Sequence, residues 1–239
     1  MLYNKRIIIK SGDKMIKITW LGQAGLLIDI NGTKIIVDPY LSNSIQKVNP
    51  QKKRNMEIDE SYLKIVPDVL VCTHNHLDHV DPETLKHYLE NEESITVLAP
   101  QSAWEETRKF GGNHNYIRFN SHTEVSLGNI KFSSVKAEHS DIHPIGVIIE
   151  VEGKKLYITG DTLYNTEIFS DIPENIDALF LPINGEGNNM NMADALRFCQ
   201  KINPKIAVPV HWGLFDHINA NDFPYERKFV PQVYKEFEI

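Results

Sequence analysis

The sequence predicts one α/β (α+β) domain in which β-sheets pack against each other and helices lie outside them. Short apolar runs bounded by turn residues recur along the chain, and helical patterns separate some of these runs but not others. At 239 residues the chain is long enough for one sizeable core and short for two. Because no linker divides it, we expect a single domain over residues 1–239.

The first half opens with an antiparallel hairpin. Apolar runs at 16–20, 26–30 and 33–38 are strand candidates, and Asn31-Gly32 separates the last two. Asn-Gly between such runs is a strong hairpin signal, because both central turn residues must adopt positive φ. Residues 1–14 carry one more apolar run, for which we expect an extra edge strand or a tail.

Strands and helices alternate in the middle of the chain. An irregular stretch at about 39–60 leads to a short buried strand at 69–72. Pro82 then opens a helix, since proline suits the first position of a helix. A strand at 95–99 and a helix at 102–110 repeat this alternation.

The second half predicts mostly strands. Gly-containing turns join the first four of them, and Asn191 is suited to cap the helix that follows. The expected strands lie at 124–127, 130–136, 146–151, 155–158, 177–183 and 205–210, and the expected helix at 192–202.

Composition narrows the class of protein. The net charge of −7 argues against non-specific binding of large nucleic acids, which requires a clustered basic surface. No run approaches the ~18 apolar residues of a membrane span, and no signal-peptide pattern is visible. Cys72 and Cys199 stand in no CxxC pattern, so we expect no disulfide framework and a cytoplasmic location.

Four potential metal ligands stand within six residues, directly after the strand at 69–72. They are His74, His76, Asp78 and His79. Imidazole nitrogens and carboxylate oxygens are ligands that zinc and similar cations accept, and a sharply turning loop between strand and helix lets several of them converge. This density favours a metal site over solvated loop histidines.

Three later strands also end in a potential ligand. The strand at 130–136 leads to His139, the one at 155–158 leads to Asp161, and the one at 205–210 leads to His211. Sites in layered α/β proteins collect at strand ends, where loops bring distant residues together. Seven donors in all match the inventory of a site for two metal ions.

The pattern His-x-His-x-Asp-His at His74–His79 resembles the signature of the metallo-β-lactamase superfamily, and the likeness spans roughly residues 16–215. The resemblance implies a four-layer αββα sandwich. It also implies that one metal is held by His74, His76 and His139, the other by Asp78, His79 and His211, and that Asp161 bridges the two.

Further segments resemble the branch of ascorbate-6-phosphate lactonase and its relatives: Trp20–Gly25, Gly160-Asp161-Thr162, Pro182–Asn191 and Pro209–Trp212. Leu163 stands where that branch is expected to carry a histidine. The resemblance implies hydrolysis of a lactone or ester in a small polar metabolite, including a phosphorylated sugar lactone such as ascorbate 6-phosphate.

Two divalent cations, Zn or Mn with Fe also compatible, would lower the pKa of a bridging water from ~15.7 towards ~7 and polarise a substrate oxygen. Hydrolysis by the resulting bridging hydroxide is the predicted chemistry. Asp78 and Asp161 are the candidate catalytic residues, because each could orient that hydroxide and take part in proton transfer.

Other functions stay open at this stage. A phosphodiesterase acting on a small nucleotide or phospho-metabolite uses the same metals, and a non-catalytic metal-binding module would keep the same ligands. A β-lactamase is disfavoured because no export signal is visible. A redox diiron protein of the superfamily is disfavoured by His rather than Glu at position 76.

Substrate contacts are predicted from residues that flank the ligands. The candidates are Gln23, Tyr164, Asn184 and Trp212. The Gly-rich run 184–191 precedes a helix, and free backbone N–H groups at a helix N-terminus suit an anion. We therefore expect an anionic small molecule as substrate, with no membrane and no large nucleic acid as partner. A homo-oligomer is compatible with the sequence. Glu138, His143 and His217 are candidates to orient the metal-binding histidines.

Overall fold

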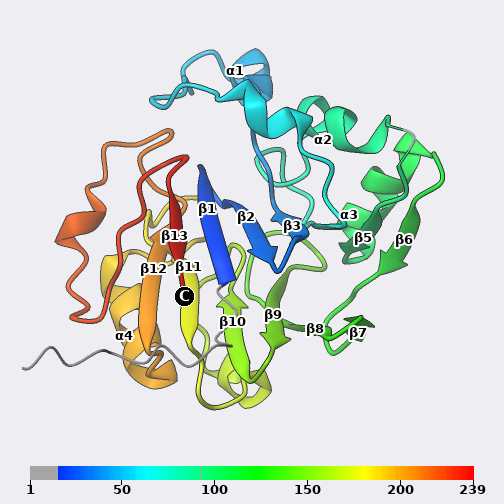
Figure 1. The fold of residues 1–239 in the computed structure, drawn as a ribbon. Helices are drawn as coiled ribbons and strands as arrows, with labels where there is room; N and C mark the ends of the chain where they lie inside the picture. The colour runs from blue at the N-terminus through cyan, green and yellow to red at the C-terminus, as the bar shows by residue number, and fades with distance from the viewer. Residues whose placement is uncertain (1–15, 92) are drawn as a thin grey trace, which may run out of the picture.

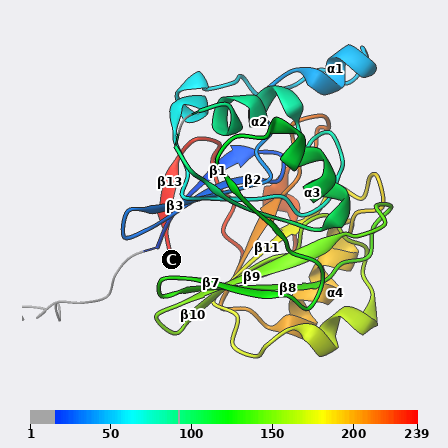
Figure 2. The same cartoon turned by 90° about the vertical axis from the view of Figure 1, so that its right-hand side faces the viewer.

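Two mixed β-sheets packed face to face form the centre of the protein (Figure 1, Figure 2). The computed structural model describes residues 16–91 and 93–239. The first sheet has the order β13-β1-β2-β3-β4-β5-β6. Its strands are β1 Ile16–Gly22, β2 Gly25–Ile30, β3 Thr33–Val37, β4 Val69–Val71, β5 Thr96–Ala99, β6 Asn115–Arg118 and β13 Glu236–Glu238.

The second sheet has the order β12-β11-β10-β9-β8-β7. Within it β10, β11 and β12 are parallel, whereas the pairs β7–β8, β8–β9 and β9–β10 are antiparallel. Its strands are β7 Glu124–Leu127, β8 Ile130–Lys136, β9 Ile145–Val151, β10 Lys154–Ile158, β11 Ala178–Pro182 and β12 Ile206–Val210.

The space between the sheets is filled by apolar side chains from both. In the first sheet, Ile18 pairs with Ile28 across β1 and β2, and both are fully buried. Opposite them, Val147 and Ile149 of β9 belong to the same cluster. Burying one such side chain contributes roughly 1.5–3 kcal/mol, so the buried side chains of this layer stabilise the packing of the two sheets.

Helices cover the outer face of each sheet. The first sheet carries α2 Pro82–Leu89 and α3 Gln101–Thr107, whose buried side chains cluster with outward-facing residues of β3, β4 and β5. The second carries α4 Met192–Ile202, whose Phe198 packs on β10 and β11. The order helix, sheet, sheet, helix is the predicted four-layer sandwich, visible edge-on in Figure 2.

Local sequence explains the helix starts. The Asp81 carboxylate accepts hydrogen bonds from the backbone N–H groups of Glu83 and Thr84 at the start of α2. At α4 the Asn191 side chain accepts from Ala193 and Asp194 in the same way. Both satisfy backbone groups that have no partner inside the helix.

Most predicted elements are present, with differences at the edges. The sequence missed β6 and β13, which are short edge strands with polar residues and therefore lack the apolar pattern of buried strands. It also missed α1 Ser44–Val48 within the stretch expected to be irregular. In the part of the chain that the structure describes, four 3-10 helices lie at Glu60–Lys64, Arg108–Phe110, Thr166–Asp171 and Ala220–Asp222. The expected strand or tail at 1–14 lies outside the described residues.

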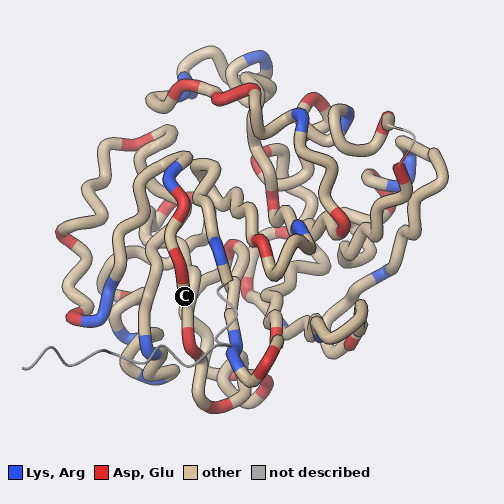
Figure 3. The backbone as a smooth tube through the Cα atoms, in the orientation of Figure 1, with Lys and Arg blue, Asp and Glu red and all other residues tan. Residues whose placement is uncertain are grey.

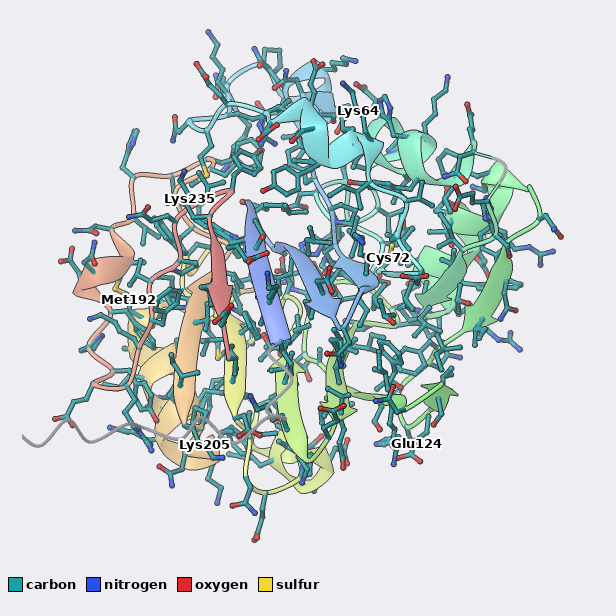
Figure 4. The ribbon with its side chains drawn as sticks, in the orientation of Figure 1. Lys64, Cys72, Glu124, Met192, Lys205 and Lys235 are labelled. Carbon is teal, nitrogen blue, oxygen red and sulfur yellow. The ribbon has the colours of Figure 1, made fainter. Side chains whose placement is uncertain are left out.

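Charged residues are spread over the surface with both signs interspersed (Figure 3). Glu124 and Lys205 stand at the periphery, whereas Cys72 follows β4 in the interior (Figure 4). Across the described residues, every helix is too short or too polar to cross a lipid bilayer.

Candidate metal centre

The loop after β4 carries the His-x-His-x-Asp-His run and turns tightly. The backbone N–H groups of His79 and Val80 both donate to the carbonyl of His76, at 3.0 and 2.8 Å. This turn leads directly to Asp81, the cap of α2. His74 and His79 are fully buried, whereas the side chain of Asp78 is 18% exposed.

Strand ends of the second sheet supply the other three residues. His139 follows β8, Asp161 follows β10 and His211 follows β12. Gly160 makes the close approach possible, because a Cβ there would lie 2.7 Å from the carbonyl oxygen of Ile145 and 2.9 Å from the Cβ of Thr73. Glycine at this position therefore lets the end of β10 lie against the loop of the first sheet.

The structure brings all seven predicted ligands together. Potential ligand atoms of three residue groups lie within 4.8 Å of one another: His74, His76 and His139; Asp78, His79 and His211; and His74, His79 and Asp161. We call the first group the first subsite and the second group the second subsite. The third group spans the two.

Asp161 lies between the subsites. Its Oδ2 atom is 4.0 Å from Nε2 of His74 and 3.7 Å from Nε2 of His139 in the first subsite. The same oxygen is 3.4 Å from Nε2 of His79 and 3.2 Å from Nε2 of His211 in the second. One carboxylate oxygen thus faces imidazole nitrogens of both groups.

Three of the four donor distances in the second subsite are close to those around a tetrahedral cation. Ligands about 2.0–2.2 Å from zinc lie about 3.3–3.6 Å apart in a tetrahedron. Nε2 of His211 lies 3.3 Å from Oδ2 of Asp78 and 3.2 Å from Oδ2 of Asp161. Nε2 of His79 lies 3.4 Å from the Asp161 oxygen and 3.9 Å from the Asp78 oxygen.

Buried polar atoms without hydrogen-bond partners point to the same conclusion. Nε2 of His74, Nε2 of His79 and Oδ1 of Asp161 are buried and unpaired. An unpaired buried polar group costs about 1–3 kcal/mol, which a bound cation would offset. The residues present therefore fit two divalent ions.

Charge accumulates in the second subsite. Burial lowers the pKa of His211, but Asp161 and Asp78 outweigh it and raise that pKa to about 10. Burial likewise opposes protonation of His79, yet Asp161, Asp38 and Asp78 raise its pKa well above the usual value. Without metal, these imidazoles hold protons that a cation must displace.

The carboxylates respond in the opposite direction. Burial favours the neutral form of Asp161, but His211 and His79 hold its pKa well below the usual value. In Asp78 burial is again outweighed by His79 and His211, so its pKa is lowered. Both carboxylates are therefore ionised, as ligands must be.

His74 and His139 of the first subsite stay neutral more readily. Burial lowers the pKa of His74 well below its usual value, and the neighbouring His79 adds to this effect. Burial also lowers the pKa of His139. Neutral imidazole is the form that binds a metal.

Asp38 is a functional residue that the sequence analysis missed. It is fully buried after β3, and its Oδ2 atom lies 2.9 Å from Nδ1 of His79. The same carboxylate accepts hydrogen bonds from the backbone N–H and hydroxyl of Thr73, and that hydroxyl lies 3.1 Å from Nδ1 of His74. Such contacts fix the ring orientation of metal-binding histidines. The signal was present, because Asp38 directly follows an apolar strand.

The polar loop before α4 supports the other side of the site. The carbonyl of Asn188 lies 3.1 Å from Nδ1 of His139, and the Asn189 amide donates to Oδ2 of Asp161 at 2.9 Å.

The three candidates predicted to orient the histidines lie elsewhere. The Glu138 carboxylate accepts from Asn165, the His143 backbone N–H donates to Asp141, and His217 is exposed.

An open cavity of about 500 Å³ leads to the metal ligands. Two of the predicted substrate contacts, Gln23 and Asn184, line it. The other two pack away from it. Trp212 stacks on Trp20 with ring centroids 4.9 Å apart, and Tyr164 packs against Phe169. Both aromatic side chains are partly buried against the core and lie outside the residues that line this cavity.

At the start of α4, where an anion site was expected, two backbone N–H groups already have a partner within the protein. The Asn191 side chain already accepts from the N–H groups of Ala193 and Asp194. At the cavity wall, Lys52 forms an ion pair with Glu186 at 2.9 Å.

Comparison with known proteins agrees with this geometry. The beta-lactamase superfamily domain matches residues 17–211. A UPF0173 metal-dependent hydrolase from Staphylococcus saprophyticus is 31% identical over 225 residues, covering 86% of this chain and 89% of the relative. The chain belongs to the metallo-β-lactamase superfamily and to its UPF0173 metal-dependent hydrolases.

Solved structures share the fold of this hydrolase. Igni18, a metallo hydrolase from Ignicoccus hospitalis, superposes with a TM-score of 0.75 at 23% identity, covering 94% of this chain and 98% of that one. The metallo-beta-lactamase fold protein YhfI from Bacillus subtilis gives 0.71 at 15% identity, covering 95% and 100%. The predicted fold is therefore confirmed, and the protein is a metal-dependent hydrolase with a His/Asp metal site.

Proposed function

We propose that the protein is a dinuclear hydrolase that opens a lactone or cleaves an ester in a small polar molecule. The observation that carries the dinuclear part is the position of Asp161, whose Oδ2 atom lies within 4.0 Å of imidazole nitrogens from both subsites. The lactone or ester specificity is supported by the resemblance of the segments Trp20–Gly25 and Pro209–Trp212 to the branch of ascorbate-6-phosphate lactonase.

In this proposal His74, His76 and His139 would hold one cation, Asp78, His79 and His211 would hold the other, and Asp161 would contribute to both. Zinc and manganese are the proposed metals, and iron accepts the same donors. Three of the four donor distances in the second subsite suit zinc, and the fourth, 3.9 Å between His79 and Asp78, is longer.

The cations would supply a water acidic enough to attack at neutral pH and a positive charge for the developing oxyanion. The protein's own residues provide orientation and proton transfer. Asp161 and Asp78 are ionised and lie beside the cavity, so either carboxylate can hold the attacking water and accept its proton. Asn189 keeps Asp161 in place through its hydrogen bond to Oδ2.

The cavity wall suits a small polar substrate. Besides the ligands it carries amide side chains, including Gln23, Asn49 and Asn184, and the apolar side chains of Ile45 and Phe215. Amides both donate and accept hydrogen bonds, which suits lactone and hydroxyl groups. Two buried free cysteines support the cytoplasm as the site of action.

Lys52 favours a second candidate function. Its ammonium group lines the cavity, and release from Glu186 would let it bind a phosphate. A phosphodiesterase acting on a small nucleotide, or a lactonase acting on a phosphorylated sugar such as ascorbate 6-phosphate, would use such a group.

The test is a hydrolysis screen on chelator-treated protein with and without restored Zn²⁺ or Mn²⁺. Lactones, carboxylic esters, phosphodiesters and phosphorylated sugar lactones are the substrates. Metal-dependent turnover of a lactone or ester is the expected result. Turnover confined to phosphodiesters would select the second candidate, and a folded, metal-loaded protein inactive on every class would contradict the proposal.

A further inference from the structure

Gln23 occupies the turn between β1 and β2 in a conformation that non-glycine residues rarely adopt. Its φ is +49°, in the left-handed region, and the residue is only 4% exposed. Its surroundings therefore determine this conformation, and the side chain is enclosed by the metal loop and the end of β12.

The backbone of Gln23 is clamped from two sides. Its carbonyl accepts a hydrogen bond from the indole N–H of Trp20 at 2.9 Å and another from the backbone N–H of His211 at 2.7 Å. The turn of the first sheet is thereby tied to the last strand of the second sheet. These two hydrogen bonds fix the backbone position from which the Gln23 side chain extends.

The side chain contacts ligand atoms of the second subsite. Its Nε2 donates to Oδ2 of Asp78 at 2.7 Å and lies 3.1 Å from Nε2 of His211. An ionised carboxylate only accepts hydrogen bonds, so the amide nitrogen, not its oxygen, must face Asp78. The Asp78 oxygen that it holds is the one lying 3.3 Å from Nε2 of His211.

The first subsite is supported by different groups. The Thr73 hydroxyl lies beside Nδ1 of His74, and the Asn188 carbonyl lies beside Nδ1 of His139. Gln23 therefore bears on one subsite, which separates its effect from that of the general fold.

We propose that Gln23 is a positioning residue that presets the Asp78 carboxylate and thereby sets the metal affinity of the second subsite alone. The inference rests on the proposed dinuclear centre. Asp78 lies on a loop and is partly exposed, so without the amide its carboxylate would have to be ordered when the metal binds. Outer contacts of this kind change metal affinity by about 10–100-fold.

The test is titration of metal-free protein with Co²⁺. Calorimetry and the visible absorption of the bound ion monitor the binding. Gln23→Gly removes the amide, keeps the backbone carbonyl and tolerates the positive φ, so folding is retained. Gln23→Met keeps the side-chain length without the N–H donor. Asn49→Ala is the matched control, because Asn49 lines the same cavity and its side chain caps Gln51.

Wild-type protein and Asn49→Ala should bind two Co²⁺ ions in two steps. In both Gln23 variants one of the two binding steps should lose about 10–100-fold in affinity, while the other step and its absorption spectrum stay unchanged. Unchanged or tighter binding at both steps, or equal loss at both steps, would overturn the role of Gln23. If wild-type protein itself fails to take up a second ion, the dinuclear proposal fails instead.

Discussion

The two sheets contribute to the metal centre in different ways. The first sheet supplies four ligands from one loop, and a fully buried carboxylate, Asp38, holds that loop through Thr73 and His79. The second sheet supplies three ligands from three separate strand ends. Neutral amides and carbonyls of the Asn188-Asn189 turn support two of these, His139 and Asp161.

The two sides of the metal centre therefore differ in how firmly they are held and in how they meet the cavity. The side of the first sheet is fixed by a charged group in a dry environment, where hydrogen bonds are strong and an unpaired group is costly. The supporting turn on the other side lines the open cavity. We infer that the ligands on the first sheet are held more firmly than those on the second.

The largest effect is expected at the junction of the two sides. Asp161→Ala removes the carboxylate shared by both subsites, so at most one metal should remain and turnover should fall by at least about 10²–10³-fold. Asp171→Ala is the control, because Asp171 pairs with His122 at the surface. Retention of two metals and of activity in Asp161→Ala would contradict the shared role.

Metal affinity should depend on pH through the second subsite. The raised pKa of His211, about 10, means that the imidazole is protonated below that pH in the metal-free protein. Displacing the His211 proton alone makes affinity rise about tenfold per pH unit, so we expect binding to be tighter by at least about 10²-fold at pH 8 than at pH 6. Calorimetry in buffers of different ionisation enthalpy measures the protons released, and pH-independent binding would be inconsistent with this account.

Weakening the anchor of the first sheet should lower both affinity and stability. Asp38→Asn keeps the shape but loses the charge that orients His79, so metal affinity should fall by about 10–100-fold. The free energy of unfolding, measured by thermal unfolding, should fall by about 1–3 kcal/mol, because buried donors are left unpaired. Unchanged unfolding of the metal-free variant would remove the distinction between the two sides.

The smallest effect is expected on the side of the second sheet. Asn189→Ala deletes one hydrogen bond to Asp161, and we expect about a tenfold loss of metal affinity, at the lower end of such effects. Stability should change less than in Asp38→Asn, since the turn faces the cavity. An effect on unfolding larger than that of Asp38→Asn would reverse the comparison.

The ligands on the first sheet could be predicted from the sequence more fully than those on the second. His74–His79 are neighbours in sequence, so their convergence needed only one tight turn. His139, Asp161 and His211 were found because each follows an apolar strand, and the parallel order of β10, β11 and β12 then brings the last two to one edge.

Other contacts depended on tertiary structure that no local pattern encodes. Asp38 follows the same strand-end rule but stood far from the motif. The role of Gln23 depends on packing of the first sheet against the second. Trp212 and Tyr164 were predicted as substrate contacts because they flank ligands in sequence, and in the structure both pack against other aromatic rings beside the core.

The most direct test of the central claim is metal content by elemental mass spectrometry on protein purified without added metal, compared between wild type and Asp161→Ala. The account predicts close to two equivalents of zinc, manganese or iron per wild-type chain and no more than one in the variant. A well-folded wild-type protein that retains no metal, and takes up none when it is supplied, would contradict it.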